Sequence, residues 1–207
     1  MPVKYKAILF DLLTGLIDSW TLWNQVAGSD EKGRRWRAEY LELTYGCGEY
    51  QPYESLVRIA AVRSGLPESL GPALERVWED LRPWDDVQPV LKQLARKHWL
   101  GVVTNCSERL GRLAAQKVGV PFQVVVTSER AGWYKPDARP YRLALTELGL
   151  QPKEVLYVAG SVFDLIGTHR VGLDTYWHNR AGLSRSENAP APIREERSFG
   201  KLFDGFG

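Results

Sequence analysis

The chain has 207 residues, of which 44% are hydrophobic and 25% are charged, and its formal net charge at pH 7 is +2. This length fits one domain, or one domain with a smaller inserted one, and the balanced charge gives no indication of a nucleic-acid partner. We expect no membrane span, because no apolar run is long enough. The two cysteines, Cys47 and Cys106, do not make a disulfide framework, and with no apolar leader segment they predict a cytoplasmic protein.

An apolar run near the N-terminus ends abruptly in an acid. Residues 5–11 have the composition of a strand buried on both faces, and Asp11 stands at its end. In an open α/β sheet, ligands bind beyond the carboxyl ends of the strands, so a functional acid at this position would face a crevice. Taken alone, the same position also suits an aspartate that caps the next helix. The rest of the chain has to decide between these two interpretations.

The stretch that follows contains no second run of this kind. Residues 18–82 have helical spacing instead and are predicted to form an insertion between the first strand and the rest of the sheet. We expect Ser29 to cap the second helix, and Gly46 and Gly48 to end it. The predicted helices of this segment lie at residues 18–26, 34–44, 53–62 and 70–81.

From residue 85 onward, strands and helices alternate as is typical of βαβ units. The predicted strands lie at residues 99–104, 122–127, 155–159 and 175–178. The predicted helices lie at residues 85–97, 108–118, 140–148 and 162–171. This alternation predicts a Rossmann-like α/β fold, in which a parallel sheet has helices on both faces. Residues 184–198, rich in Ser, Pro, Glu and Arg, are expected to be an exposed tail or connector.

Polar side chains follow the ends of the predicted strands. They are Asp11, Thr104, Asn105, Lys135, Ser161 and Asp164. The carboxyl ends of parallel strands meet at one edge of a sheet, so these side chains should converge on one crevice. A carboxylate beside a lysine stays ionised and can act as a nucleophile, while hydroxyl and amide groups can donate to developing negative charge. Asp164 could orient Lys135 or activate a water molecule.

Other reactive residue types give weaker signals. Cys106 follows Asn105, but neither of its neighbours is a histidine, so we interpret it as a small buried filler. The three histidines have no ligand spacing, so the sequence predicts no metal site from them.

The order of these strand-end residues resembles a known family. Four segments are similar, in this order on alternating βα units, to the motifs of the haloacid dehalogenase superfamily: Asp11, Thr104-Asn105, Lys135-Pro136-Asp137 and Asp164. The resemblance covers about residues 5–180, and the helical insertion matches the cap of such enzymes. It implies a core domain of residues 1–17 and 83–207 and a cap domain of residues 18–82. It also implies that Asp11, Lys135 and Asp164 are catalytic.

Two departures separate the chain from the phosphatases of this superfamily. Phosphatases carry a second Asp two residues after the nucleophile, where this chain has Leu13. They also carry an acid beside the glycine of the last motif, to hold Mg²⁺, but Gly160 is followed by Ser161. One carboxylate beside Asp11 gives too few oxygen ligands for a tight Mg²⁺ site. The resemblance therefore implies an enzyme without a cofactor, and Mg²⁺ would be required only by a phosphatase.

Three segments resemble the 2-haloacid dehalogenases specifically, and one of them is the stretch Tyr50-Gln51-Pro52-Tyr53-Glu54-Ser55 of the cap. Trp36-Arg37 with residues 41–44 resembles the stretch whose Arg meets the substrate carboxylate and halide, and a guanidinium can bind a carboxylate through two hydrogen bonds. Lys135 is followed six residues later by Tyr141, as in that branch. The residues expected to contact the substrate or its leaving group are Leu13, Thr14, Arg37, Thr104, Asn105, Tyr141 and Ser161.

Three positions depart from the dehalogenase pattern: Gly15, Ala159 and Ser161 stand where those enzymes have Thr, Ser and Asn. The sequence predicts a hydrolase that displaces halide from a small 2-haloalkanoic acid through an aspartyl ester. Two alternatives stay open, namely a phosphatase with relaxed motifs that acts on a small phosphomonoester, and a non-catalytic binding protein with the same fold. The expected partner is a small anionic substrate, and a homodimer is left open.

Overall fold

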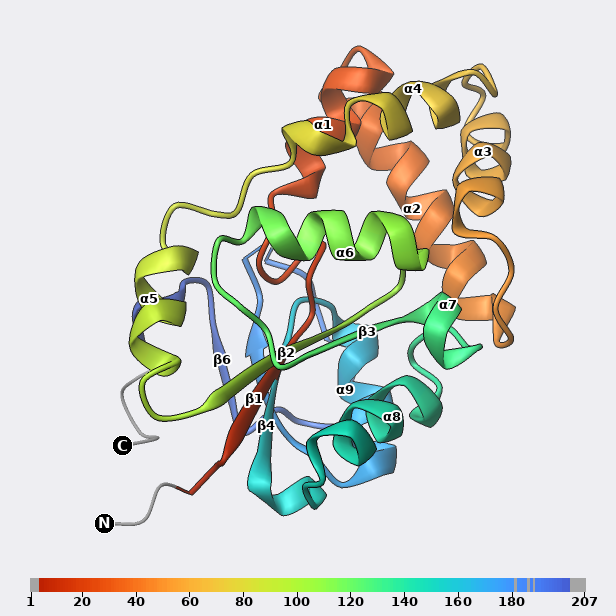
Figure 1. Cartoon of the computed structure of the whole chain (residues 1–207). Helices are drawn as coiled ribbons and strands as arrows, with labels where there is room; N and C mark the ends of the chain where they lie inside the picture. The colour runs from red at the N-terminus through yellow and green to blue at the C-terminus, as the bar shows by residue number, and fades with distance from the viewer. Residues whose placement is uncertain (1–3, 181, 186, 188, 202–207) are drawn as a thin grey trace.

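Six strands form one parallel sheet at the centre of the computed structural model, which describes residues 4–180, 182–185, 187 and 189–201 (Figure 1). Their order across the sheet is β3-β2-β1-β4-β5-β6, so β1 lies in the interior between β2 and β4. This order confirms the predicted α/β class. The strands are β1 (Ala7–Phe10), β2 (Trp99–Thr104), β3 (Val124–Thr127), β4 (Val155–Ala159), β5 (Asp174–His178) and β6 (Arg194–Glu196).

Helices cover both faces of this sheet. Successive side chains of a strand point to opposite faces, and in β1 Ile8 and Phe10 join one apolar cluster whereas Ala7 and Leu9 join the other. The first cluster includes residues of α5 (Val87–Leu94) and α6 (Glu108–Lys117), and the second those of α8 (Ala138–Leu148) and α9 (Val162–Val171). A sheet buried on both faces accounts for the continuous apolar runs of its strands.

The segment between β1 and α5 is helical, as predicted, and lies over the carboxyl ends of the strands (Figure 1). Its helices are α1 (Ser19–Ala27), α2 (Asp30–Cys47), α3 (Tyr53–Arg63), α4 (Leu70–Arg76) and the 3-10 turn η1 (Trp78–Asp80). Its tryptophans are mainly core residues: Trp23, Trp36 and Trp78 are buried, and Trp36 Nε1 donates to the Val57 carbonyl at 2.9 Å. Along the described residues, no helix has the length and apolar content that a membrane crossing requires.

Several predicted helix ends were wrong. Gly46 does not end α2, which starts at Asp30 and continues to Cys47 before Gly48 takes a φ of 71°. One glycine in a long helix costs only about 1 kcal/mol, which neighbouring contacts offset. The helix predicted at residues 70–81 divides into α4 and η1, and a short helix that was not predicted, α7 (Ser128–Ala131), follows β3.

The region predicted as an exposed tail contributes a strand to the sheet. Within residues 184–198, of which 186 and 188 lie outside the described residues, β6 pairs in parallel with β5 through Tyr176 and Arg194. Phe199 beyond it is buried. The three residues of β6 are all charged, so they have no apolar alternation that could mark a strand. Short, charged edge strands of this kind also discourage pairing with other chains.

The last residue of β5 fixes the turn that follows β1. His178 is buried, and its Nδ1 lies 3.1 Å from the Gly15 carbonyl oxygen. A carbonyl only accepts, so Nδ1 carries the hydrogen. The ring also lies 4.0 Å from that of Phe199. Burial, helped by the positive charge of Arg180, lowers the pKa of His178 to about 4, so the ring is neutral at neutral pH.

This histidine should make the protein sensitive to acid. The pKa of His178 is about 4 in the folded protein, and the ordinary histidine value of 6.5 applies to the unfolded chain. Between these two pH values the unfolded chain therefore binds a proton that the folded chain does not. The free energy of unfolding should therefore decrease as the pH falls through this window. His178→Asn can still donate to Gly15 but does not titrate, so urea unfolding at about pH 7 and pH 4.5 should show a weaker pH dependence than wild type. An equal pH dependence in both proteins would contradict the assignment.

Candidate active site

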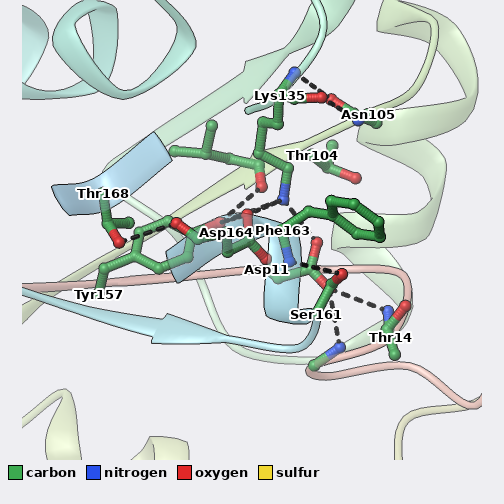
Figure 2. A network of polar contacts seen from close by, with 12 residues as sticks. Asp11, Thr14, Thr104, Asn105, Lys135, Tyr157, Ser161, Phe163, Asp164 and Thr168 are labelled. Carbon is green, nitrogen blue, oxygen red and sulfur yellow. Dashed lines mark hydrogen bonds and ion pairs between the residues drawn. The ribbon is translucent and has the colours of Figure 1, made fainter. Parts of the chain in front are cut away.

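The carboxylate of Asp11 is held from two sides at the end of β1. Its Oδ2 accepts hydrogen bonds from the backbone N–H groups of Thr14 at 3.3 Å and Gly15 at 3.1 Å, while Oδ1 accepts from Lys135 Nζ at 2.8 Å (Figure 2). A Cβ on Gly15 would lie 2.4 Å from the backbone oxygen of Asp11, and one on Gly160 would lie 2.4 Å from Oδ2. Glycine at both positions therefore lets the chain close around the carboxylate, which explains the departure at Gly15.

Lys135 connects two carboxylates in the protein interior. Its ammonium lies 2.8 Å from Asp11 Oδ1 and 2.9 Å from Asp164 Oδ1, and the residue is 3% exposed. Burial works against its charge, but the two carboxylates outweigh it and raise the pKa of Lys135 above the ordinary value. The side-chain amide of Asn105 holds the backbone of Lys135. Its Oδ1 accepts from the Lys135 N–H at 2.8 Å, and its Nδ2 donates to the Lys135 carbonyl at 3.1 Å. The predicted loop lysine is therefore a buried cation.

Asp164 lies in the first turn of α9 and uses its two oxygens differently. Oδ1 accepts from Tyr141 at 2.8 Å and Tyr157 at 3.2 Å, besides Lys135. Oδ2 is buried and has no hydrogen-bond partner among the described residues. Burial raises the pKa of Asp164, opposed by Lys135 and reinforced by Asp11. Tyr141 therefore supports Asp164 rather than touching Lys135, and one carboxylate oxygen is left to accept a proton.

Arg37 projects from α2 toward the turn after β1. Its Nη1 donates to Ser19 Oγ at 2.6 Å, and its Nη2 donates to Thr14 Oγ1 at 2.9 Å and to the Leu13 carbonyl at 3.3 Å. The guanidinium lies 4.2 Å from the centre of the Trp20 ring, and the residue is 3% exposed. Burial lowers the pKa of Arg37, but an arginine stays charged at neutral pH. A fixed positive group thus lies beside the turn that carries Asp11.

One small cavity, of about 30 Å³, joins Asp11, Lys135 and Arg37, whereas Asp164, which is bound to Lys135, is not among the residues that line it. The hydroxyl of Thr104 is buried at its wall and has no partner within the part of the chain that the structure describes. A larger hollow of about 890 Å³ is lined by Trp20 among other residues, but neither Asp11 nor Lys135 lines it. The lining residues are Asp11, Leu13, Thr14, Trp23, Arg37, Tyr40, Leu41, Tyr45, Tyr53, Thr104, Asn105, Lys135 and Ser161.

Sequence reasoning missed several residues of the site. Tyr157 lies in β4, and its hydroxyl accepts from Lys135 at 3.2 Å. A tyrosine inside a fully buried strand needs a partner for its hydroxyl, and that was the available signal. Ser19 and Tyr45 carried no such signal, because both lie in ordinary helical patterns. Cys106 is fully buried and burial raises the pKa of its thiol, which supports its interpretation as a filler.

The donor set does not suit a resident Mg²⁺ ion. The two carboxylates that face each other, Asp11 and Asp164, are already bridged by the ammonium of Lys135. Mg²⁺ prefers about six oxygen ligands in octahedral geometry, and two carboxylates already bound to a lysine supply few. Nowhere in the described ranges do three or more His, Cys, Asp or Glu side chains gather so that they could hold a metal ion.

Comparison with known proteins agrees with this geometry. The (S)-2-haloacid dehalogenase of Pseudomonas sp. (strain YL) is 27% identical over 221 residues, which cover 97% of this chain and 94% of that protein. The L-2-haloacid dehalogenase of Xanthobacter autotrophicus matches in structure with a TM-score of 0.84 and 21% identity over 96% of each chain. Its structure with chloropropionic acid covalently bound matches with a TM-score of 0.83 and 20% identity, again over 96% of each chain. Residues 8–178 match the family model of the haloacid dehalogenase-like hydrolases, and the chain belongs to that family.

Proposed function

We propose that this protein is a 2-haloacid dehalogenase, which converts a small 2-haloalkanoic acid into a 2-hydroxy acid and halide. The observation that carries the proposal is that the buried guanidinium of Arg37 lines the same small cavity as the Asp11–Lys135 ion pair. An anion-binding group and a carboxylate nucleophile therefore face one small space. The related (S)-2-haloacid dehalogenase and the relative that carries covalently bound chloropropionic acid support the same assignment.

We further propose that residues 18–82 form a cap domain over a core of residues 1–17 and 83–207. Side chains of these helices complete the cavity, since Arg37, Tyr40 and Tyr45 come from α2 and Tyr53 from α3. Such a cover excludes water, and the exclusion of water strengthens the electrostatic interactions beneath the cover. A cytoplasmic location belongs to this proposal, because both cysteines are free thiols.

In the first step, Asp11 acts as the nucleophile. Oδ1 attacks C2 of the substrate, the carbon–halogen bond breaks, and the halide leaves with the bonding electron pair. Attack from the face opposite to the halogen inverts C2, which sets the configuration of the product. The ammonium of Lys135 lies 2.8 Å from Oδ1 and places a positive charge beside the carboxylate, and Arg37 binds the substrate carboxylate and the leaving group.

In the second step, water hydrolyses the Asp11 ester. If Oδ1 carries the substrate, Oδ2 becomes the ester carbonyl oxygen, and the N–H groups of Thr14 and Gly15 already point at it. These two donors stabilise the oxyanion that forms when water attacks Cγ. The water gives a proton to Asp164, whose Oδ2 is the free acceptor, and Asp164 returns it to the departing alkoxide.

The remaining predicted residues shape the cavity or position the catalytic groups. Thr104 offers its unpaired hydroxyl to the substrate, and the Leu13 side chain forms an apolar wall. Asn105 fixes the Lys135 backbone, and Tyr141 fixes Asp164, so both act by positioning. In this mechanism no step requires a metal ion or an organic cofactor, because the nucleophile, its counter-ion and the base all belong to the chain.

A substrate panel tests the reaction class. We expect the protein to release halide from (S)-2-chloropropionate, with the same rate when a chelator is present, because the mechanism uses no metal. Release of phosphate from a small phosphomonoester that depends on Mg²⁺ and stops with chelator would instead make the protein a phosphatase. Binding of 2-haloacids without release of either anion would make it a non-catalytic binding protein.

The nucleophile can be tested by removing its charge. Asp11→Asn should lower kcat by about 10⁴-fold or more, because a carboxamide is not a competent nucleophile for this displacement. In single-turnover reactions of the wild type in ¹⁸O-labelled water, mass spectrometry should detect label in the Asp11 carboxylate. The exposed Asp80 makes Asp80→Asn a matched control that should keep full activity. Label found in the product alone would contradict the ester route.

The role of Arg37 depends on the shape of its guanidinium. Arg37→Lys keeps the charge but loses the planar fork, and the loss of a hydrogen bond to a charged group should lower kcat/KM by about 10- to 150-fold. Arg37→Ala should lower it further. Arg34 lies on the same helix with a side chain 70% exposed, so Arg34→Lys is the control and should have no effect. Unchanged kinetics of Arg37→Ala, in a variant that circular dichroism shows to be folded, would remove Arg37 from the mechanism.

A further inference from the structure

Tyr45 reaches the cavity, although the mechanism above does not use it. It lies two helical turns beyond Arg37 on α2, so the two side chains lie on the same side of that helix. Its hydroxyl donates to Ser161 Oγ at 3.0 Å. Its ring stacks on that of Phe163, with ring centres 3.9 Å apart and ring planes inclined by 25°. These two contacts fix the phenol against the start of α9.

The hydrogen bonds of Ser161 determine where its own hydrogen can go. A serine hydroxyl has one donor and two acceptor lone pairs. Oγ accepts one bond from Tyr45 at 3.0 Å. It accepts another from the backbone N–H of Phe163 at 3.3 Å (Figure 2). No hydrogen bond between described residues uses the Ser161 hydrogen as a donor, and Ser161 lines the cavity. The Tyr45 hydroxyl therefore leaves the Ser161 hydrogen free to donate into the cavity.

The position of Ser161 shows which step this donor can serve. Its neighbour Gly160 lies so close to Asp11 that an added Cβ would be 2.4 Å from Oδ2. Ser161 is thus the next residue in the chain after Gly160, whose backbone packs against the Asp11 carboxylate. In an in-line displacement the halide leaves on the side of C2 opposite to the attacking oxygen, so a donor beside Asp11 is badly placed for the halide. It is well placed for the water that attacks Cγ of the ester.

We infer that Tyr45 is a positioning residue for the hydrolysis of the ester: it holds the Ser161 hydroxyl so that the hydroxyl donates to the hydrolytic water. The water oxygen forms a bond to Cγ of Asp11, and one of its protons passes to Asp164. The bond between Cγ and the substrate oxygen then breaks, the alkoxide takes that proton from Asp164, and the Asp11 carboxyl releases the second proton to solvent. The inference rests on the proposed function and assigns the Tyr45–Ser161 pair to its second step alone.

Single-turnover kinetics with (S)-2-chloropropionate separate the two steps. Quenched samples give halide release by ion chromatography and esterified Asp11 by mass spectrometry. Tyr45→Phe keeps the stacked ring but removes the hydroxyl, so the ester should decay about 3- to 10-fold more slowly while halide release keeps its wild-type rate. Ser161→Ala should slow ester decay at least as much. The double variant should be no slower than Ser161→Ala, because the two hydroxyls act through one contact.

Tyr50→Phe is the matched control. Tyr50 is also half-buried, and its hydroxyl accepts from the Tyr53 N–H at 3.3 Å, so its loss should change neither phase. Wild-type ester decay in Tyr45→Phe, slowed halide release, or additive effects in the double variant would each overturn the role of Tyr45 while the proposed function stands. A wild type that releases no halide would overturn the proposed function, and this inference with it.

Discussion

The site depends on one buried cation between two carboxylates. Lys135 lies within 3 Å of both Asp11 and Asp164, and each of these three residues is at most 6% exposed. Two facing carboxylates without that ammonium would repel each other, and the buried ammonium alone would be equally costly, so the three charges are stable only together. They come from the end of β1, the loop after β3 and the first turn of α9. The parallel sheet, in which β1 lies in the interior between β2 and β4, brings those ends together.

The inserted helices are tied to the same centre through the backbone that follows Asp11. The Leu13 carbonyl accepts from Ser19 and Arg37, and the Thr14 hydroxyl also accepts from Arg37. Residues of α1 and α2 thus fix the same backbone turn whose N–H groups bind Asp11 Oδ2. Since Arg37 also lines the cavity, its contacts link the packing of α2 to the geometry of the turn that carries Asp11.

Two of the three departures from the dehalogenase pattern, Gly15 and Ser161, have a local physical setting in the structure, and nothing in the structure explains the third, Ala159. Gly15 has no room for a side chain, because a Cβ would meet the backbone oxygen of Asp11, and the two N–H groups of this turn hold the carboxylate instead. Ser161 is small, but Tyr45 reaches it from α2 and fixes its hydroxyl. A different set of donors thus surrounds the carboxylate of Asp11, and the inserted helices hold part of that set through Tyr45.

The sequence alone predicted the parallel α/β sheet, the helical insertion and the residues at the strand ends, because buried strands and amphipathic helices have strong local patterns. It also predicted that Lys135 would meet Asp11, since strand order in βαβ units limits which ends can converge. It missed β6, whose three charged residues form a strand only because the edge of β5 is there to pair with. It missed Ser19 and Tyr45 for the same reason: a hydroxyl on a helix gains a role only from the group opposite it. That opposite group is set by how the inserted helices pack on the sheet, which depends on contacts between residues far apart in the chain and so was decided by the tertiary structure.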